Sequence, residues 1–453
     1  MKKFIETIKN IFKIEDLRKR ILYTLGIILI YRLGSHIVLP GINPGSLTAF
    51  SKSAQEGLLG LLDLFSGGAF SNASIFALGI MPYISASIVI QLMTLAVPYF
   101  QRLQKEGESG RKKINQITRY LTVAVVAIQA PAYIANIQGQ FAYAIHPSMY
   151  GATFLGFSAF ALTSFILLIA GTLFIMWLGE RITDKGIGNG VSMIILIGII
   201  ARLPQSLFQE FVSRLSANSG GLIMFLGEIL LLLAVTVFSI LLVQGTRKIP
   251  VQYAKRVVGN KQYGGARQYI PLKVNAAGVM PIIFAQAIMF IPATIMQFSK
   301  AGAGGAFAIA MSDITGFWYN FIYAILIILF TWFYTAITIN PVQMAEDMKR
   351  NGGFIPGVKP GKKTADYLDE IMSRITFPGS LFLAFIAIMP AFAKFFGVST
   401  GFSQFFGGTS LLILVGVVLD TLQQIESHLL MRHYDGLLKS GRIKGRTGII
   451  AAY

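Results

Sequence analysis

The sequence of 453 residues contains no cysteine and only four histidines. Without cysteine the chain forms no disulfide, no thiolate metal site and no cysteine nucleophile. The histidines, His36, His146, His428 and His433, show no metal-ligand spacing, and HExxH, GxSxG and Walker A motifs are absent. The stretch GIGNG lacks the Lys-Ser/Thr pair that a phosphate-binding loop requires. We therefore expect neither an enzyme nor a bound cofactor or metal.

Charge is also scarce, at 13% of the residues, whereas hydrophobic residues make up 54% and the mean hydropathy is +0.64. Soluble domains carry about 25% charged residues. The chain is therefore predicted to be an all-α integral membrane protein with several spans. Residues 1–20 are amphipathic and basic, without the apolar core of a signal peptide, so we expect them to lie along the cytoplasmic membrane surface.

Ten segments are long and apolar enough to cross a hydrocarbon core of about 30 Å. They lie near 21–39, 73–95, 118–138, 153–179, 187–205, 220–243, 275–297, 316–339, 376–396 and 407–428. If the N-terminus is cytoplasmic, roughly 33 of the 39 Lys and Arg residues fall in or beside cytoplasmic segments. This positive-inside bias predicts that both termini are cytoplasmic.

Ten spans divide into two five-helix halves, 21–205 and 206–428, followed by a cytoplasmic tail, 429–453. An odd number of spans in each half inverts the second half relative to the first, as in channels and transporters built from inverted repeats. No repeat is visible in the residues themselves, so a plain ten-helix bundle is the alternative.

Two cytoplasmic loops, 244–273 and 341–374, are longer than a simple turn requires. The stretch from 244 to 274 carries seven basic residues and no acidic one, with tyrosines interleaved, and the second loop is mixed in charge and rich in Gly and Pro. We expect the second loop to be ordered, with a helix toward its end. Anchoring to anionic lipid would explain the basic residues. We favour a docking surface for a large acidic or phosphate-bearing partner such as ribosomal RNA.

The span SIFALGIMPYISASIVIQLM, residues 74–93, follows a second apolar piece, LLDLFSGGAFSNA, that is broken by glycines and polar residues. Together they predict two helical pieces with a break between them. These stretches, with GTLFIMWLGERITDKGIGNGVSMIILIGIIA, PLKVNAAGVMPIIFA, NGGFIPGVKPGKKTADYLDEIMSRIT and FGGTSLLILVGVVLD, resemble the signature segments of the SecY family. The resemblance covers most of the chain, and it implies a protein-conducting channel.

The resemblance assigns the piece before the break, about Leu58 to Ser71, as a half-helix plug in the outer funnel of an hourglass pore. Gly67 and Gly68 would give the plug the backbone freedom to move, although a tight turn would also need them. The pore waist maps onto five isoleucines that form an uncharged constriction, which blocks ions by dewetting. These residues are Ile80, Ile84, Ile195, Ile283 and Ile413.

The family's lateral gate, which releases membrane segments into lipid, would open between the spans at 73–95 and 275–297. By resemblance Gln91 and Asn275 lie on this seam. Ser87, with Ser85, offers further polar contacts, although ordinary helix packing accounts for both serines better.

The resemblance also implies partners: the SecA ATPase and the ribosome at the two long loops, the small subunits SecE and SecG, the lipid bilayer, and preproteins that carry a signal sequence. Docking is carried over to Lys359, Lys255 and Arg256. The family commonly has arginine where Lys359 stands, and lysine lacks its bidentate fork. The implied location is a bacterial plasma membrane.

The alternative is a secondary transporter, which also has inverted repeats and a broken helix. A transporter needs an ionisable residue inside the membrane for coupling. The candidates Arg32, Glu228 and Asp420 are scattered over three spans, which fits structural pairing or an interfacial position better than a coupling site.

Overall fold

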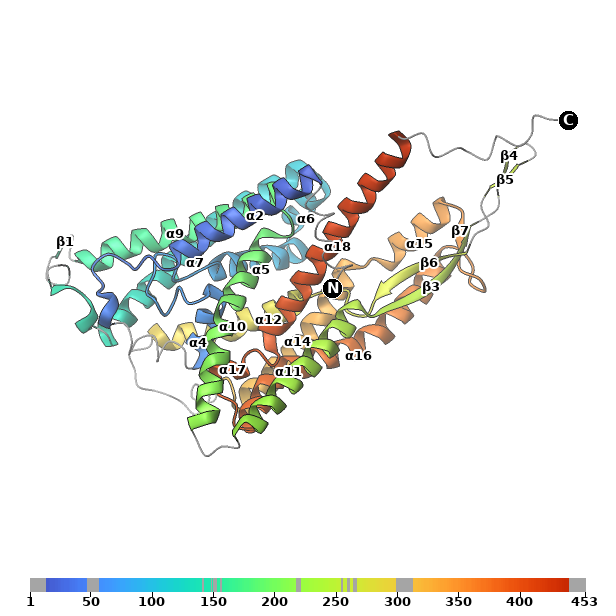
Figure 1. Ribbon diagram of the computed structural model, residues 1–453. Helices are drawn as coiled ribbons and strands as arrows, with labels where there is room; N and C mark the ends of the chain where they lie inside the picture. Colours follow the sequence, from blue (N-terminus) through green and yellow to red (C-terminus); the bar gives the residue numbers. More distant parts are fainter. Residues whose placement is uncertain are drawn as a thin grey trace.

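The computed structural model describes most of the chain. Its described residues are 14–46, 57–140, 142–147, 149, 153–154, 157–216, 221–253, 256–258, 261–263, 267–298 and 313–439. Within them the structure is mainly helical, and the strands lie in the connections between the long helices (Figure 1). This is the class of structure that the composition predicts.

Each of the ten predicted spans contains one main helix. These helices are α2 (Glu15–Gly34), α5 (Met81–Ala96), α7 (Glu108–Gln140), α9 (Ala159–Lys185), α10 (Gly190–Ser216), α11 (Gly221–Gln244), α12 (Met280–Phe298), α14 (Phe317–Thr338), α16 (Lys362–Phe395) and α18 (Gly408–Lys439). Seven described helices are long and apolar enough to cross a membrane, and α5 with the following α6 (Pro98–Lys105) makes an eighth if the bent pair is one span. The remaining two are α12, which has a shorter apolar stretch, and α2, which carries basic residues at both ends.

The span predicted at 73–95 begins as a helix only at Met81, so its predicted start is wrong by eight residues. The residues before it form turns because Ala73 and Gly79 both have positive φ, 45° and 57°, which no helix accommodates. Pro82 then stands in the first turn, where the missing N–H costs no hydrogen bond. At the other end Pro98 opens α6, which turns away from α5 by 95°.

The helices form two groups that meet along a central contact. Figure 1 shows α2, α7 and α9 on one side and α11, α14 and α16 on the other. Between them α10 packs against α18, and α5 contacts α12. A central apolar cluster spans both groups, and each group has a further cluster of its own. The two groups correspond to the two predicted halves.

The two long loops form one folded body. In this body β3 (Thr246–Tyr253) pairs antiparallel with β6 (Arg267–Lys273), and β7 (Gly353–Phe354) adds from the second loop to the other edge of β3. The helix α15 (Pro341–Arg350) and the start of α16 cover the sheet, and Val251, Met348 and Leu368 share its core. A helix toward the end of the second loop was predicted and is present.

Candidate channel seal

A short buried helix, α4 (Gly57–Ser66), and the turn after it fill the middle of the first group. The helix ends where Gly67 and Gly68 adopt φ of +65° and +93°, values at which a side chain would be strained. The turn then folds back on the helix, since Phe70 N donates to Ser66 Oγ at 3.0 Å and Gly68 N to Asp63 O at 2.9 Å. The sequence therefore builds a compact plug-shaped segment.

This segment shares an apolar cluster with the isoleucines that the sequence analysis singled out. Ile80, Ile84, Ile195 and Ile413 are all buried in the central apolar cluster, and Ile283 is partly buried against it. Leu64, Phe65 and Ala69 of the α4 segment belong to the same cluster. The five isoleucines come from α5, α10, α12, α18 and the turn before α5. That the five isoleucines form the waist of a pore stays a prediction.

A buried ion pair fixes the α4 segment to α10. The guanidinium of Arg202 contacts the carboxylate of Asp63, whose side chain is 4% exposed. Arg202 Nη2 also donates to Ser71 Oγ at 2.5 Å, and Ser71 N donates to Asp63 Oδ1 at 2.8 Å. The turn, the half-helix and α10 are thus held by one closed set of polar contacts. A buried charge of this kind needs such partners.

Three further side chains donate to backbone carbonyls of the same segment. Tyr31 Oη donates to Ser66 O at 3.0 Å, Arg32 Nη1 to Gly67 O at 2.8 Å, and Tyr133 Oη to Phe70 O at 3.0 Å.

The donors lie on α2 and α7, so with Arg202 on α10 all four of these side-chain contacts reach the segment from the first half of the chain. The apolar contacts differ, because Ile283 and Ile413 come from the second half.

Gly67 and Gly198 make the closest approach between the segment and α10. A Cβ on Gly67 would lie 2.7 Å from Gly198 Cα, and a Cβ on Gly198 would lie 2.6 Å from Phe65 O. The two backbones therefore touch where neither residue has a side chain. This contact, together with the positive φ, explains glycine at position 67 in the resting structure, and movement about the pair Gly67 and Gly68 stays a prediction.

The sequence analysis did not find the partners Asp63, Arg202, Tyr31 and Tyr133. One signal was available: Asp63 is the one acidic residue in the apolar run LLDLF, and an unpaired carboxylate there would be costly. Its partner lies 139 residues further along the chain, so spacing could not identify it.

The predicted lateral-gate residues lie on α5 and just before α12, two helices that contact each other. Gln91 is half-buried, and its Nε2 donates to Ser87 Oγ on its own helix at 3.5 Å. Asn275 is buried just before α12, and its Nδ2 donates to Gly278 O at 3.0 Å. Each of these residues therefore has a partner within its own segment, and their role at a lateral gate stays a prediction.

Of the predicted docking residues, Lys359 lies in the folded body of the two loops, and Arg256 lies in a separate two-stranded sheet. Lys359 is exposed in the turn between β7 and α16, and its carbonyl accepts from Thr364 Oγ1 at 2.9 Å. Arg256 begins β4 (Arg256–Val258), which pairs with β5 (Lys261–Tyr263). Lys255 lies outside the described residues.

The three ionisable candidates for transport coupling have other surroundings. Arg32 donates to Gly67 O, as described above. Glu228 is buried against Arg214, which also pairs with Glu210. Asp420 is exposed and lines a cavity of about 250 Å³ beside Asn275. Structural pairing therefore explains Arg32 and Glu228, as the sequence analysis favoured.

Comparison with known proteins agrees with this geometry. The family model SecY matches residues 74–422. The protein translocase subunit SecY of Streptomyces coelicolor is 45% identical over 444 residues, covering 94% of this chain and 98% of the relative. That of Aquifex aeolicus is 43% identical over 439 residues, covering 96% and 99%.

Solved structures show the same fold at lower identity. A structure described as a protein conducting channel superposes with a TM-score of 0.61 at 18% identity, covering 90% of this chain and 92% of the other. A second structure, described as concerning the plug domain of the SecY protein, has a TM-score of 0.59 at 17% sequence identity, with the same coverage of both chains. Sec61 in a canine ribosome–channel complex has a TM-score of 0.58 at 16% sequence identity, again covering 90% of this chain and 92% of the other.

Two groups of long apolar helices around a shared apolar cluster define a helical membrane protein with several spans. The similarity to its relatives extends over nearly the whole chain. The chain belongs to the SecY family.

Proposed function

We propose that this chain is the channel subunit of a protein translocase, and not an enzyme. It passes unfolded polypeptides with a signal sequence across a bacterial plasma membrane, with both termini on the cytoplasmic side. The observation that carries the proposal is the central apolar cluster that joins residues of the α4 segment to four of the five isoleucines, with Ile283 packed against it, since a protein channel must stay closed to ions when idle.

The α4 segment is the plug in this proposal, and the isoleucines are the pore ring. An isoleucine ring is apolar, so it holds no water when closed, and its side chains can part around a passing chain. The four side chains that donate hydrogen bonds to the plug lie on α2, α7 and α10. They hold the plug in place as long as these helices of the first half keep their positions.

Sideways release into lipid uses the contact of α5 and α12. Ile84 and Ile88 of α5 and Phe284 of α12 pack there in the central cluster. A signal sequence is itself an apolar helix, so it can replace such contacts with similar ones. Gln91, Ser87 and Asn275 border this path.

The two long loops are the proposed docking surface for the SecA ATPase or the ribosome, with Lys359, Lys255 and Arg256 as contacts. Seven basic residues without an acidic one along 244–274 favour a phosphate-rich partner such as ribosomal RNA. The Sec61 complex with the ribosome is an analogy for this partnership. SecE and SecG are the small subunits proposed to complete the channel.

Cysteine crosslinking tests the proposed path, because the chain has no cysteine of its own. One cysteine replaces Ile84 or Ile283, and another is placed in a secretory chain that is arrested on the ribosome. After oxidation we expect a crosslinked band, since a chain that threads the ring passes within disulfide distance of it.

The matched control replaces Leu230, an exposed residue of α11, with cysteine. A crosslink at the ring that is missing at position 230, and missing for chains without a signal sequence, supports the channel. Equal crosslinking at all three positions, or none at the ring in an assembled complex, contradicts it and reopens the transporter alternative with Asp420 as the first residue to test.

A further inference from the structure

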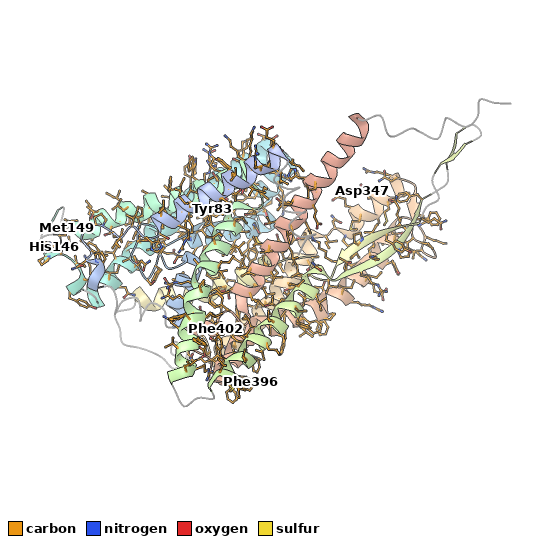
Figure 2. The ribbon with its side chains drawn as sticks, viewed as in Figure 1. Tyr83, His146, Met149, Asp347, Phe396 and Phe402 are labelled. Atoms are coloured by element: carbon orange, nitrogen blue, oxygen red, sulfur yellow. The ribbon has the colours of Figure 1, made fainter. Side chains whose placement is uncertain are left out.

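A cavity of about 90 Å³ lies in the second half of the chain, away from the polar contacts that hold the α4 segment. Its walls come from α12, α14, α16 and the stretch from α17 (Thr400–Ser403) to the start of α18. Figure 2 labels Phe402 in α17 and shows this end of the molecule opposite the end that carries Asp347 on α15. Nothing in the proposed translocation path uses this cavity.

Two buried polar side chains reach the cavity without a hydrogen-bond partner among the described residues. Gln286 of α12 is 3% exposed and its Oε1 is unpaired, and Tyr323 of α14 is 5% exposed and its Oη is unpaired. Both side chains line the cavity. Buried polar atoms in folded proteins nearly always have a partner, so these two indicate a bound molecule.

The chemistry of the walls limits what that molecule is. Gln286 Oε1 only accepts, so the ligand must donate to it, whereas the tyrosine hydroxyl both donates and accepts and can pair with a donor or an acceptor. Thr409 and Ser410 add hydroxyl groups at the first turn of α18. A volume of about 90 Å³ is the share of about three water molecules in the liquid.

The charged residues at the cavity do not favour an ion. Asp313 and Lys394 both line it and are exposed, but their charges are opposite. Asp313 Oδ1 accepts from Thr315 N at 3.0 Å and from its Oγ1 at 2.7 Å, and Lys394 Nζ donates to Thr315 Oγ1 at 3.1 Å. The two charges are therefore partnered around one threonine, and the ligand is a small neutral molecule.

We propose that this cavity is a binding site for a small cluster of ordered water molecules that joins Gln286 Oε1 to Tyr323 Oη. Gly408, Thr409 and Ser410 of α18 line the same site. Water rearranges more easily than packed side chains do, so the first turn of α18 can shift without leaving polar atoms unpaired. Ile413 lies one turn further along α18, so it can shift together with that first turn.

Radiolytic hydroxyl labelling of the full chain in lipid nanodiscs tests the site, with water as the probe. A tyrosine beside bound water is labelled even when bulk solvent cannot reach it, because the radical forms from that water. The matched internal control is Tyr31, which is 1% exposed and donates to Ser66 O. We expect Tyr323 to be labelled at least about tenfold faster than Tyr31 if its hydroxyl faces ordered water.

The variant Gln286→Leu removes the acceptor and makes this wall apolar. We expect the labelling rate of Tyr323 to fall severalfold while that of Tyr31 stays unchanged, which also shows that the fold is intact. Labelling of Tyr323 no faster than that of Tyr31 in the unmodified chain would show that the cavity is dry and would overturn the proposal. Unchanged labelling in the variant would overturn the role of Gln286.

Discussion

The seat of the plug and the seam between α5 and α12 are held by different kinds of contact. At the seat, a buried ion pair and four hydrogen bonds reach the α4 segment from α2, α7 and α10. At the seam, apolar side chains of both helices share the central cluster, and the hydrogen bonds of Gln91 and Asn275 stay within their own segments.

The difference teaches how one channel can seal and still open. Directional polar contacts define a single position, and breaking them leaves buried groups unpaired, which is costly. Apolar contacts have no fixed partner, so one apolar helix can replace another. We propose that contacts of the first kind hold the α4 segment in one place, and that contacts of the second kind between α5 and α12 let an apolar signal helix enter.

The largest effect is expected from breaking the ion pair of the seat with Arg202→Ala. Loss of one partner leaves the buried carboxylate of Asp63 uncompensated, at a cost of about 3–5 kcal/mol. The plug then loses most of the free energy that favours its position in the closed channel, so the idle channel should leak ions. Conductance of the purified complex in planar bilayers, without substrate, measures the leak.

Two controls sharpen that result. Arg374→Ala breaks an exposed pair with Glu370 and should leave conductance unchanged. Replacing both partners, Asp63→Leu with Arg202→Met, removes the charges together and should restore most of the seal. If Arg202→Ala conducts no more than the Arg374→Ala control, the polar contacts do not hold the plug and the contrast with the seam is lost.

A smaller effect on the seat is expected from Gly198→Ala. The added Cβ would lie 2.6 Å from Phe65 O, so the α4 segment must move away from α10, at a cost of about 1–3 kcal/mol. A cysteine in place of the buried Ala69 reports the movement through its rate of alkylation by a maleimide, which should rise. The matched control is Gly227→Ala, because nothing lies within 4 Å of a Cβ there. Equal rates in both variants would show that the close approach of α4 to α10 does not matter.

The sequence predicts the spans well because each needs only a long apolar run. All ten contain a helix, yet the start of the span at 73–95 is wrong, since the turns before Met81 are apolar too and hydropathy does not distinguish them from helix. Pro82 was the local signal for the true start. The pairing of β3 with β7 was not predicted either, because it joins two loops about a hundred residues apart.

The seal could be predicted only in part. The resemblance selected the five isoleucines, and the structure places all five in or against one cluster. The polar contacts of the α4 segment join residues that are far apart in the sequence, such as Tyr133 with Phe70 and Arg202 with Asp63. A single sequence does not reveal such pairs without the fold. Gly198 in the middle of a helix gave no hint that another backbone touches it.

The smallest effect is expected at the seam, from Gln91→Leu. The Gln91 side chain is half-buried, and its hydrogen bond at 3.5 Å joins it to Ser87 on the same helix, so its loss does not loosen α5 from α12. Hydrogen bonds inside membranes average about 0.6 kcal/mol, which corresponds to less than about a threefold change. The rate of translocation of a preprotein with a weakened signal sequence measures how easily the seam parts. A change as large as the effect of Arg202→Ala on the seal would contradict this expectation. It would mean that Gln91 forms a hydrogen bond between α5 and α12 in the working channel. The seat and the seam would then be held by the same kind of contact.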